Sequence, residues 1–267
     1  MQKVIIFLRS ILFKLLLAVH TVVFGSLVII TYPFGRKVQW YFVDRYTDAV
    51  MLSLKYVAGI SYRVTGSENI PRNETCVFWS KHQSILELYI LQNYMPRHTW
   101  VFKKILLYVP FFGWGLRAID AIGIDRKGGR SAVEQIIDIG RQRLDNGISV
   151  MLFPEGTRMP IGKTRKYGRS GAYLAKETGH KIVPIAHNAG EFWGRQNLLM
   201  CPGEVQVVIG KAIDPEDKSI DEITLESKTW IESTMREISP VYSKKAAYYK
   251  ARGDQDTAGE LKDSRKK

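Results

Sequence analysis

Residues 131–153, SAVEQIIDIGRQRLDNGISVMLF, place a helical pattern directly before a strand pattern. The first part opens with a capping box, Ser131 to Glu134, which is a typical helix start. Residues 148–153 are apolar and β-branched and follow a glycine, so they are predicted to form a buried strand. The residues that share one face of the expected helix are Val133, Ile136, Ile137, Gly140 and Leu144.

Before and after this unit, other short β-type runs alternate with helical patterns. Such alternation is typical of an α/β fold, so we predict a mixed sheet flanked by helices. A last helix is expected over residues 221–238. The other predicted strands are 62–65, 75–79, 181–185 and 205–209.

Composition divides the chain into three parts: N-terminal membrane-anchoring helices (1–58), an α/β domain (59–239) and a polar tail (240–267). Residues 15–32 form an apolar run of 18 residues with His20 as its one titratable group. As a helix this run is about 27 Å long, just short of a hydrocarbon core of roughly 30 Å. It is long for a signal peptide and lacks a small-residue cleavage site, so a retained anchor is predicted.

The sequence does not decide two features of the N-terminal part. Cations flank the apolar run on both sides, Lys14 before it and Arg36 after it, so the sequence does not decide whether the helix spans the membrane or lies half-buried. Residues 38–57 are amphipathic, which fits either an interfacial helix or an ordinary surface helix.

The chain is strongly basic, with a formal net charge of +13 and a pI near 9.6. This charge favours anionic partners such as phosphorylated molecules, anionic lipids or nucleic acid. No nucleic-acid-binding motif is present, so a nucleic-acid partner is not expected. The two cysteines, Cys76 and Cys201, have no metal-type spacing, and no metal site is predicted.

The most reactive group expected in the chain is His82, which follows a predicted strand. Glu87 comes five residues later, which on a straight helix would place the two side chains on different faces. The pair meets if His82 lies in the loop before a helix and Glu87 lies in its first turn. The carboxylate would then hold one imidazole nitrogen and leave the other free to accept a proton. Alone, this pair is weak evidence, because a polar loop at a strand end looks the same.

Two further groups give this pair a context. Arg126 precedes the helix at Ser131, and with Lys103 and Lys104 it could hold an anion, although a basic surface turn fits as well. In residues 153–158, FPEGTR, the proline ends the strand and Gly156 permits a tight turn. Glu155 and Arg158 would then project from the carboxyl end of that strand, where open sheets bind ligands, or would close a purely structural turn.

The motifs of this chain and their order resemble those of the glycerolipid acyltransferases, and especially of the bacterial 1-acylglycerol-3-phosphate acyltransferases. The resemblance covers roughly residues 60–210. The family pattern His-x-x-x-x-Asp corresponds to residues 82–87, with Glu87 in place of the aspartate. Residues 123–126, GIDR, match the second motif, residues 153–158 the third and residues 182–185, IVPI, the fourth. The resemblance assigns the substrate phosphate to Arg126, Glu155, Gly156 and Arg158, with Lys103 or Lys104 as helpers.

The resemblance implies acyl transfer from a thioester of coenzyme A or acyl carrier protein to lysophosphatidic acid, with His82 as base and no other cofactor. Its implied place is the bacterial inner membrane, with the domain on the cytoplasmic side. Two alternatives stay open: a sister enzyme acting on glycerol 3-phosphate or another lysolipid, and a noncatalytic basic membrane protein.

Overall fold

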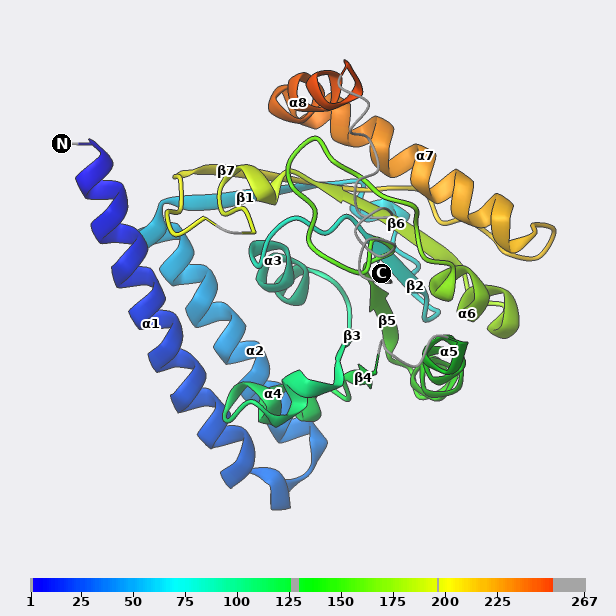
Figure 1. The fold of residues 1–267 in the computed structure, drawn as a ribbon. Helices are drawn as coiled ribbons and strands as arrows, with labels where there is room; N and C mark the ends of the chain where they lie inside the picture. Colours follow the sequence, from blue (N-terminus) through cyan, green and yellow to red (C-terminus); the bar gives the residue numbers. More distant parts are fainter. Residues whose placement is uncertain (1, 126–129, 196, 252–267) are drawn as a thin grey trace, which may run out of the picture.

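The computed structural model describes residues 2–125, 130–195 and 197–251 (Figure 1). All five predicted strands are present, together with two that the sequence did not indicate, β3 and β4. The strands are β1 (Ile60–Thr65), β2 (Val77–Ser80), β3 (His98–Lys103), β4 (Ile122–Ile124), β5 (Ser149–Leu152), β6 (Ile182–His187) and β7 (Gly203–Ile209). They form one sheet in the order β1-β7-β6-β2-β5-β3-β4.

The sheet is mixed, as predicted, but its central part is parallel. β6 and β7 pair antiparallel, whereas β2 pairs in parallel with both β5 and β6, and β3 pairs in parallel with β5 and β4. The carboxyl ends of these parallel strands therefore lie at one edge of the sheet. The segments that follow β2 and β5 meet there, and they carry most of the predicted site residues.

Helices cover both faces of the sheet. On one face lie α5 (Arg130–Asp145), α6 (Ser170–Thr178) and α7 (Ile220–Ile238), whose apolar residues pack in one cluster with Val77 and Trp79. Phe78, between them in β2, points to the opposite face and packs with α3 (Leu86–Tyr94) and the N-terminal helices. The helix predicted to begin with a capping box begins one residue earlier, at Arg130, and the Ser131 side chain is outside the described part.

The N-terminal helices α1 (Gln2–Ile30) and α2 (Arg36–Ser53) lie side by side, and α4 (Phe112–Ala118) packs against them (Figure 1). Short 3-10 turns follow α1 (η1, Tyr32–Phe34), β1 (η3, Ser67–Asn69), β3 (η4, Lys104–Tyr108) and β6 (η6, Ala189–Glu191), and a π turn (η2, Leu54–Ala58) follows α2. Helix α1 starts well before the predicted apolar run. Among the described residues it is the one helix long and apolar enough to cross a membrane.

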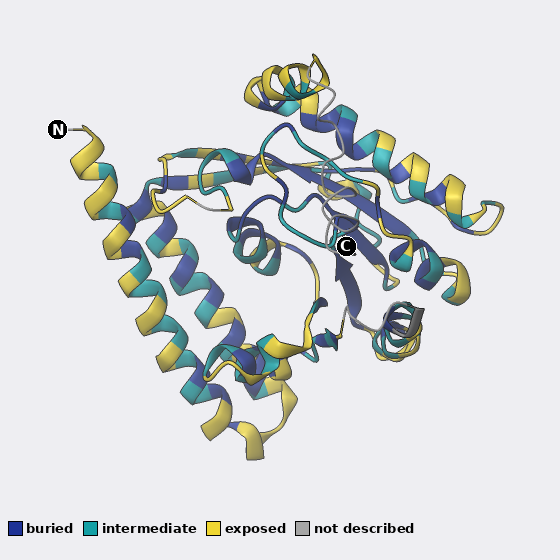
Figure 2. Ribbon diagram, viewed as in Figure 1, coloured by how far each residue is buried: buried dark blue, intermediate teal, exposed yellow. Residues whose placement is uncertain are grey.

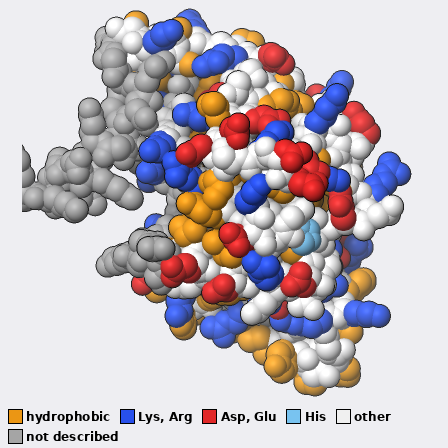
Figure 3. Space-filling model, turned by 90° about the vertical axis from the view of Figure 1, so that its right-hand side faces the viewer, with side chains coloured by type: hydrophobic (Ala, Val, Ile, Leu, Met, Phe, Trp, Pro, Cys, Tyr) orange, Lys and Arg blue, Asp and Glu red, His pale blue; other side chains and the backbone are white. Residues whose placement is uncertain are grey.

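The first half of the predicted C-terminal tail is a helix, α8 (Pro240–Ala251), which contacts α7. Tyr242 of α8 is 1% exposed, so this helix is joined to the domain rather than free of it. The rest of the tail lies outside the described residues. On the face that carries α5, α6 and α7, Lys and Arg are interspersed with Asp and Glu, so the basic charge is not gathered there (Figure 3).

Candidate active site

The loop between β2 and α3 brings His82 and Glu87 together. β2 is buried along its length and ends at Ser80, and α3 begins at Leu86. His82 therefore lies in the loop and Glu87 in the first turn of the helix, as the sequence predicted. His82 Nδ1 lies 2.7 Å from Glu87 Oε1, and the side chains are 16% and 1% exposed.

Glu87 is held in its charged form by several donors. Its Oε1 accepts from the Gln83 amide at 3.1 Å, and its Oε2 accepts from the Ser84 amide at 2.8 Å. Burial alone would raise the pKa of Glu87, but His187, His82 and the Ser84 amide outweigh it, so the pKa is lowered. An ionised carboxylate can only accept a hydrogen bond. His82 Nδ1 must therefore carry a proton, and in the neutral imidazole the lone pair is then on Nε2.

Phe153 holds the imidazole ring from one side. The two rings are stacked, with centroids 3.8 Å apart and planes 12° apart, and Trp100 stacks in turn on Phe153 at 5.5 Å. Stacking and the Glu87 hydrogen bond together restrict both rotatable bonds of His82. In the described part of the chain Nε2 has no hydrogen-bond partner, so it is free to act on a substrate hydroxyl.

The turn at residues 153–158 is tied to the backbone of His82. Gly156 has φ of +64°, which favours glycine, and its amide donates to Phe153 O at 2.9 Å. The Met159 amide donates to His82 O at 2.7 Å, and the His82 amide donates to Glu155 Oε2 at 3.0 Å. Both backbone polar groups of His82 are thus held by this turn.

Glu155, one of the predicted phosphate contacts, does not face the solvent. Its side chain is fully buried and forms an ion pair with Lys81, whose Nζ lies 2.7 Å from Oε1. Burial raises the pKa of Glu155 to about 7, against the lowering effect of Lys81. Both carboxylate oxygens thus have partners inside the protein, and contact of Glu155 with a substrate phosphate stays a prediction.

Comparison with known proteins places this geometry in a family. A family model described as Acyltransferase matches residues 61–188. A protein of Pseudomonas aeruginosa named 1-acyl-sn-glycerol-3-phosphate acyltransferase is 40% identical over 88% of this chain and 93% of its own length. The chain belongs to the acyltransferase family.

Two further comparisons are with more distant proteins. A chloroplast protein of Brassica napus, named 1-acyl-sn-glycerol-3-phosphate acyltransferase BAT2, is 29% identical over 77% of this acyltransferase, which spans 61% of that protein's length. The crystal structure of the LPA acyltransferase PlsC from Thermotoga maritima is 22% identical and covers 89% of this chain and 98% of its own, with a TM-score of 0.76. That likeness shows a shared fold.

The predicted cations of this acyltransferase lie around the same edge of the sheet. Arg158 is partly exposed at the end of the 153–158 turn, and its carbonyl accepts from Arg195 Nη1 at 3.2 Å. Lys103 is exposed at the end of β3, in register with Ile124 of β4, and Lys104 is exposed next to it. Arg126 lies outside the described residues. Contact of Arg158, Lys103, Lys104 and Gly156 with a phosphate stays a prediction.

Sequence reasoning missed the polar cluster behind the site. No role was predicted for Lys81, which is completely buried. Its partners Glu232 and Tyr242 belong to α7 and α8, which lie far along the chain. The one local signal was a lysine directly after a fully buried strand, since a lysine in such a place needs buried anionic partners.

Proposed function

We propose that this acyltransferase transfers a fatty acyl group from an acyl thioester to the free hydroxyl of 1-acylglycerol 3-phosphate, giving phosphatidic acid. The observation that carries the proposal is the His82–Glu87 pair, with Nε2 free at the ligand-binding edge of the sheet. The printed names of the relatives supply the acceptor class.

In the proposed reaction His82 Nε2 takes the proton of the acceptor hydroxyl as its oxygen attacks the thioester carbonyl. The imidazolium that forms is stabilised by ionised Glu87 through Nδ1. Collapse of the tetrahedral intermediate breaks the carbon–sulfur bond, and the imidazolium returns its proton to the departing thiolate. The acyl group passes directly between the substrates, because the acceptor itself is the nucleophile. No bound cofactor or metal is required in this scheme.

A panel of acceptors tests the proposal. Purified protein in detergent is assayed with 1-acylglycerol 3-phosphate, glycerol 3-phosphate and lysophospholipids that have larger headgroups, each with coenzyme A and acyl carrier protein thioesters. We expect the highest kcat/KM with 1-acylglycerol 3-phosphate. Turnover of glycerol 3-phosphate alone would point to the sister activity, and no turnover with any pair would reject the proposed function.

The acceptor's phosphate is assigned to the exposed cations at the carboxyl edge, with Arg158 as the main contact. Arg158 follows the turn that holds His82, so a phosphate bound there would aim its glycerol hydroxyl toward Nε2. Among the described residues the Arg158 guanidinium has no carboxylate partner and is available for an anion. A planar guanidinium can contact two phosphate oxygens at once.

Replacing Arg158 with alanine is expected to raise the KM for the acceptor by about ten- to hundredfold, since a charge-assisted hydrogen bond contributes roughly 1.5–3 kcal/mol. The KM for the thioester should stay within about twofold. Arg141→Ala, which removes an exposed cation from α5, is the matched control. If the thioester KM rises and the acceptor KM does not, Arg158 binds the donor's phosphates or an acidic carrier protein instead.

An apolar cavity of about 110 Å³ lies between α1, α2, α3 and α4 and could hold the acyl chain of the thioester. Trp100 and Phe102 line this cavity, and the ring contacts from Trp100 through Phe153 lead from it to His82. The cavity wall includes Val28 of α1, which is 3% exposed. We assign the thioester's acyl chain to this space because it is apolar and only the rings of Trp100 and Phe153 separate it from His82.

Val28→Phe should shift the preferred donor toward shorter chains. Burying one methylene contributes about 0.8 kcal/mol, so each methylene excluded by the larger ring should lower kcat/KM for long donors roughly fourfold. The comparison is made with a series of acyl thioesters of increasing length. Val23→Phe places the same ring on the exposed side of α1, where Val23 is 48% exposed, and should leave the preference unchanged. An identical length profile in Val28→Phe would exclude this cavity.

We place the protein on the cytoplasmic side of a bacterial inner membrane, held by α1. One side of α1 contacts the rest of the protein: Arg9 Nε donates to Val57 O in η2 at 2.5 Å, and Ser10 Oγ accepts from the Met200 amide of the domain at 2.9 Å. The other side is apolar and exposed (Figure 2). A helix bound to the domain along one side fits insertion into one leaflet better than a free span. Its exposed residues include Ile5, Leu8, Leu12, Leu15, Val19 and Val22.

The protein should stay with membranes after a high-salt wash, because apolar burial is not screened by salt. Replacing Leu8, Leu12 and Leu15 together with glutamine should release most of it and lower vesicle binding at least tenfold. Leu225→Gln removes an equally exposed leucine from α7 and should change neither result. Complete release of the unaltered protein by salt would show that only charge holds it.

A further inference from the structure

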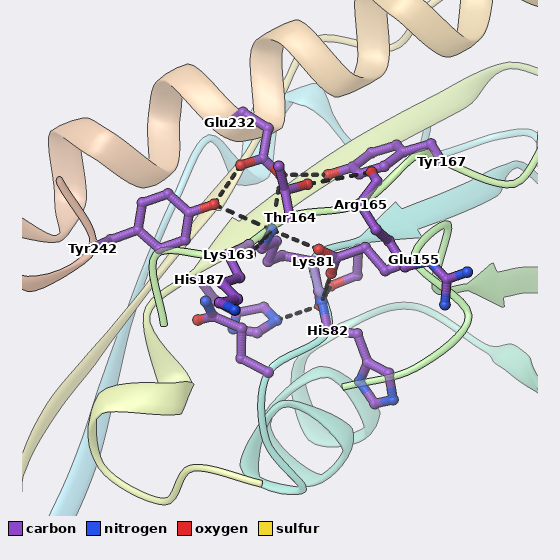
Figure 4. A network of polar contacts seen from close by, with 12 residues as sticks. Lys81, His82, Glu155, Lys163, Thr164, Arg165, Tyr167, His187, Glu232 and Tyr242 are labelled. Atoms are coloured by element: carbon purple, nitrogen blue, oxygen red, sulfur yellow. Dashed lines mark hydrogen bonds and ion pairs between the residues drawn. The ribbon is translucent and has the colours of Figure 1, made fainter. Parts of the chain in front are cut away.

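A lysine that the proposed reaction does not use lies directly before the catalytic loop residue. The Lys81 ammonium is completely buried and lies 2.7 Å from Glu155 Oε1 and 2.8 Å from Glu232 Oε1. Burial alone would lower the pKa of Lys81, but the carboxylates of Glu155 and Glu232 raise it overall, so the side chain is charged. Figure 4 shows it at the centre of a cluster whose members come from distant parts of the chain.

The cluster joins the two C-terminal helices to this lysine. Tyr242 of α8 donates to Glu232 of α7 through a short hydrogen bond, and Tyr167 donates to the same carboxylate at 2.9 Å. The Lys81 ammonium also lies 3.4 Å from the Tyr242 hydroxyl. Glu232 is therefore fixed by two phenols, and it fixes the lysine in turn.

From Lys81 the contacts continue to the backbone of His82. Glu155 binds Lys81 with one carboxylate oxygen and accepts the His82 amide with the other at 3.0 Å. The Lys81 carbonyl accepts from His187 Nε2 at 2.7 Å, and the Lys81 amide donates to Ile185 O at 3.0 Å, so β6 holds the same peptide from behind. Because the Lys81 carbonyl can only accept a hydrogen bond, His187 Nε2 is the donor in this contact.

We propose that Tyr242, Glu232, Lys81 and Glu155 form a positioning relay that aims the His82 imidazole at the acceptor hydroxyl. None of the four is a catalytic residue, because each acts through the next one. The inference rests on the proposed function. It assigns α8 and Glu155 a role in positioning the catalytic base. A relay of this kind controls the orientation of His82 and leaves substrate affinity to the exposed cations.

Two other roles for these residues make different predictions. If the cluster only stabilises the fold, its variants should melt earlier, but kcat per folded molecule should be unchanged. If Glu155 contacts the acceptor's phosphate, its variants should raise the acceptor KM. A positioning relay predicts a lower kcat with both KM values nearly constant, because a displaced base slows the chemical step and not binding.

The experiment compares Glu232→Gln, Tyr242→Phe and Glu155→Gln in the full-length chain, with kcat normalised to the folded fraction. We expect kcat to fall about tenfold in Glu232→Gln, somewhat less in Tyr242→Phe and more in Glu155→Gln, with both KM values within about twofold of wild type. Glu226→Gln, on the exposed side of α7 and paired with Lys218, and Tyr62→Phe on β1 are controls expected to keep full kcat.

A double variant tests whether the members act in series. Because Tyr242 acts through Glu232, adding Tyr242→Phe to Glu232→Gln should lower kcat little further, whereas independent contributions would multiply. The relay would be contradicted if folded Glu232→Gln and Tyr242→Phe keep the wild-type kcat. It would also be contradicted if Glu155→Gln raises the acceptor KM tenfold. Neither result would affect the acyl transfer measured for the wild-type protein. A wild-type protein inactive with every acceptor would instead reject the proposed function itself.

Discussion

Replacing His82 with alanine is expected to lower kcat by at least about a hundredfold, the usual loss when a general base is removed. Nε2 is the free imidazole nitrogen at the site, and Phe153 and Glu87 already hold the ring in place. Alanine removes the imidazole that accepts the proton and adds no bulk to the loop between β2 and α3. Folding and membrane attachment should survive, because Glu87 keeps its backbone donors from Gln83 and Ser84. The measurement is steady-state acyl transfer together with thermal melting.

Variants of the partner and of a distant histidine complete this test. Glu87→Asp should retain substantial activity and Glu87→Gln much less, because the amide cannot stabilise an imidazolium as a carboxylate does. His180→Ala, after α6, should behave as wild type. Near-normal turnover in His82→Ala would mean that another group takes the proton.

The second large effect is expected on stability. Lys81→Met should lower the free energy of unfolding by about 3–5 kcal/mol, because it leaves Glu155 and Glu232 buried without their shared cation. Denaturant unfolding in detergent measures this loss. Adding Glu232→Gln to Lys81→Met should recover part of it, since one unpaired buried charge is removed.

The control for this effect is Lys218→Met. Lys218 forms an ion pair with Glu226 at 2.7 Å on the exposed side of α7, and such surface pairs contribute at most about 1 kcal/mol. A Lys81→Met protein as stable as the Lys218→Met protein would contradict the buried ion-pair cluster.

Periodicity predicted much of the fold, and its failures have physical causes. β5 and the other predicted strands are short, apolar and clearly bounded, so their pattern was sufficient. β3 was missed because it ends in Lys103 and runs straight into η4, so no turn signal marks its end. β4 has three residues with Gly123 at its centre, too few to show any alternation. Both strands depend on pairing with β5 or with each other, which is a long-range property.

The site shows the same division between local and distant contacts. The His82–Glu87 contact could be predicted because a five-residue loop and one helical turn determine it. The burial of Glu155 could not be predicted, because a glutamate in a turn at a strand end looks solvent-exposed. Its burial depends on Lys81 and Glu232, the latter 77 positions further along, and no local pattern reports such a partner.

The most direct test of direct acyl transfer, with His82 acting on the acceptor hydroxyl, is a rapid-mixing experiment with enzyme in excess over an acyl-labelled thioester. Without acceptor, we predict no release of thiol and no label on the protein. With 1-acylglycerol 3-phosphate, thiol and labelled phosphatidic acid should appear together in equal amounts, and both should be lost in His82→Ala. Thiol released without acceptor, with the label bound to the protein, would contradict this account and show that an acyl-enzyme forms first.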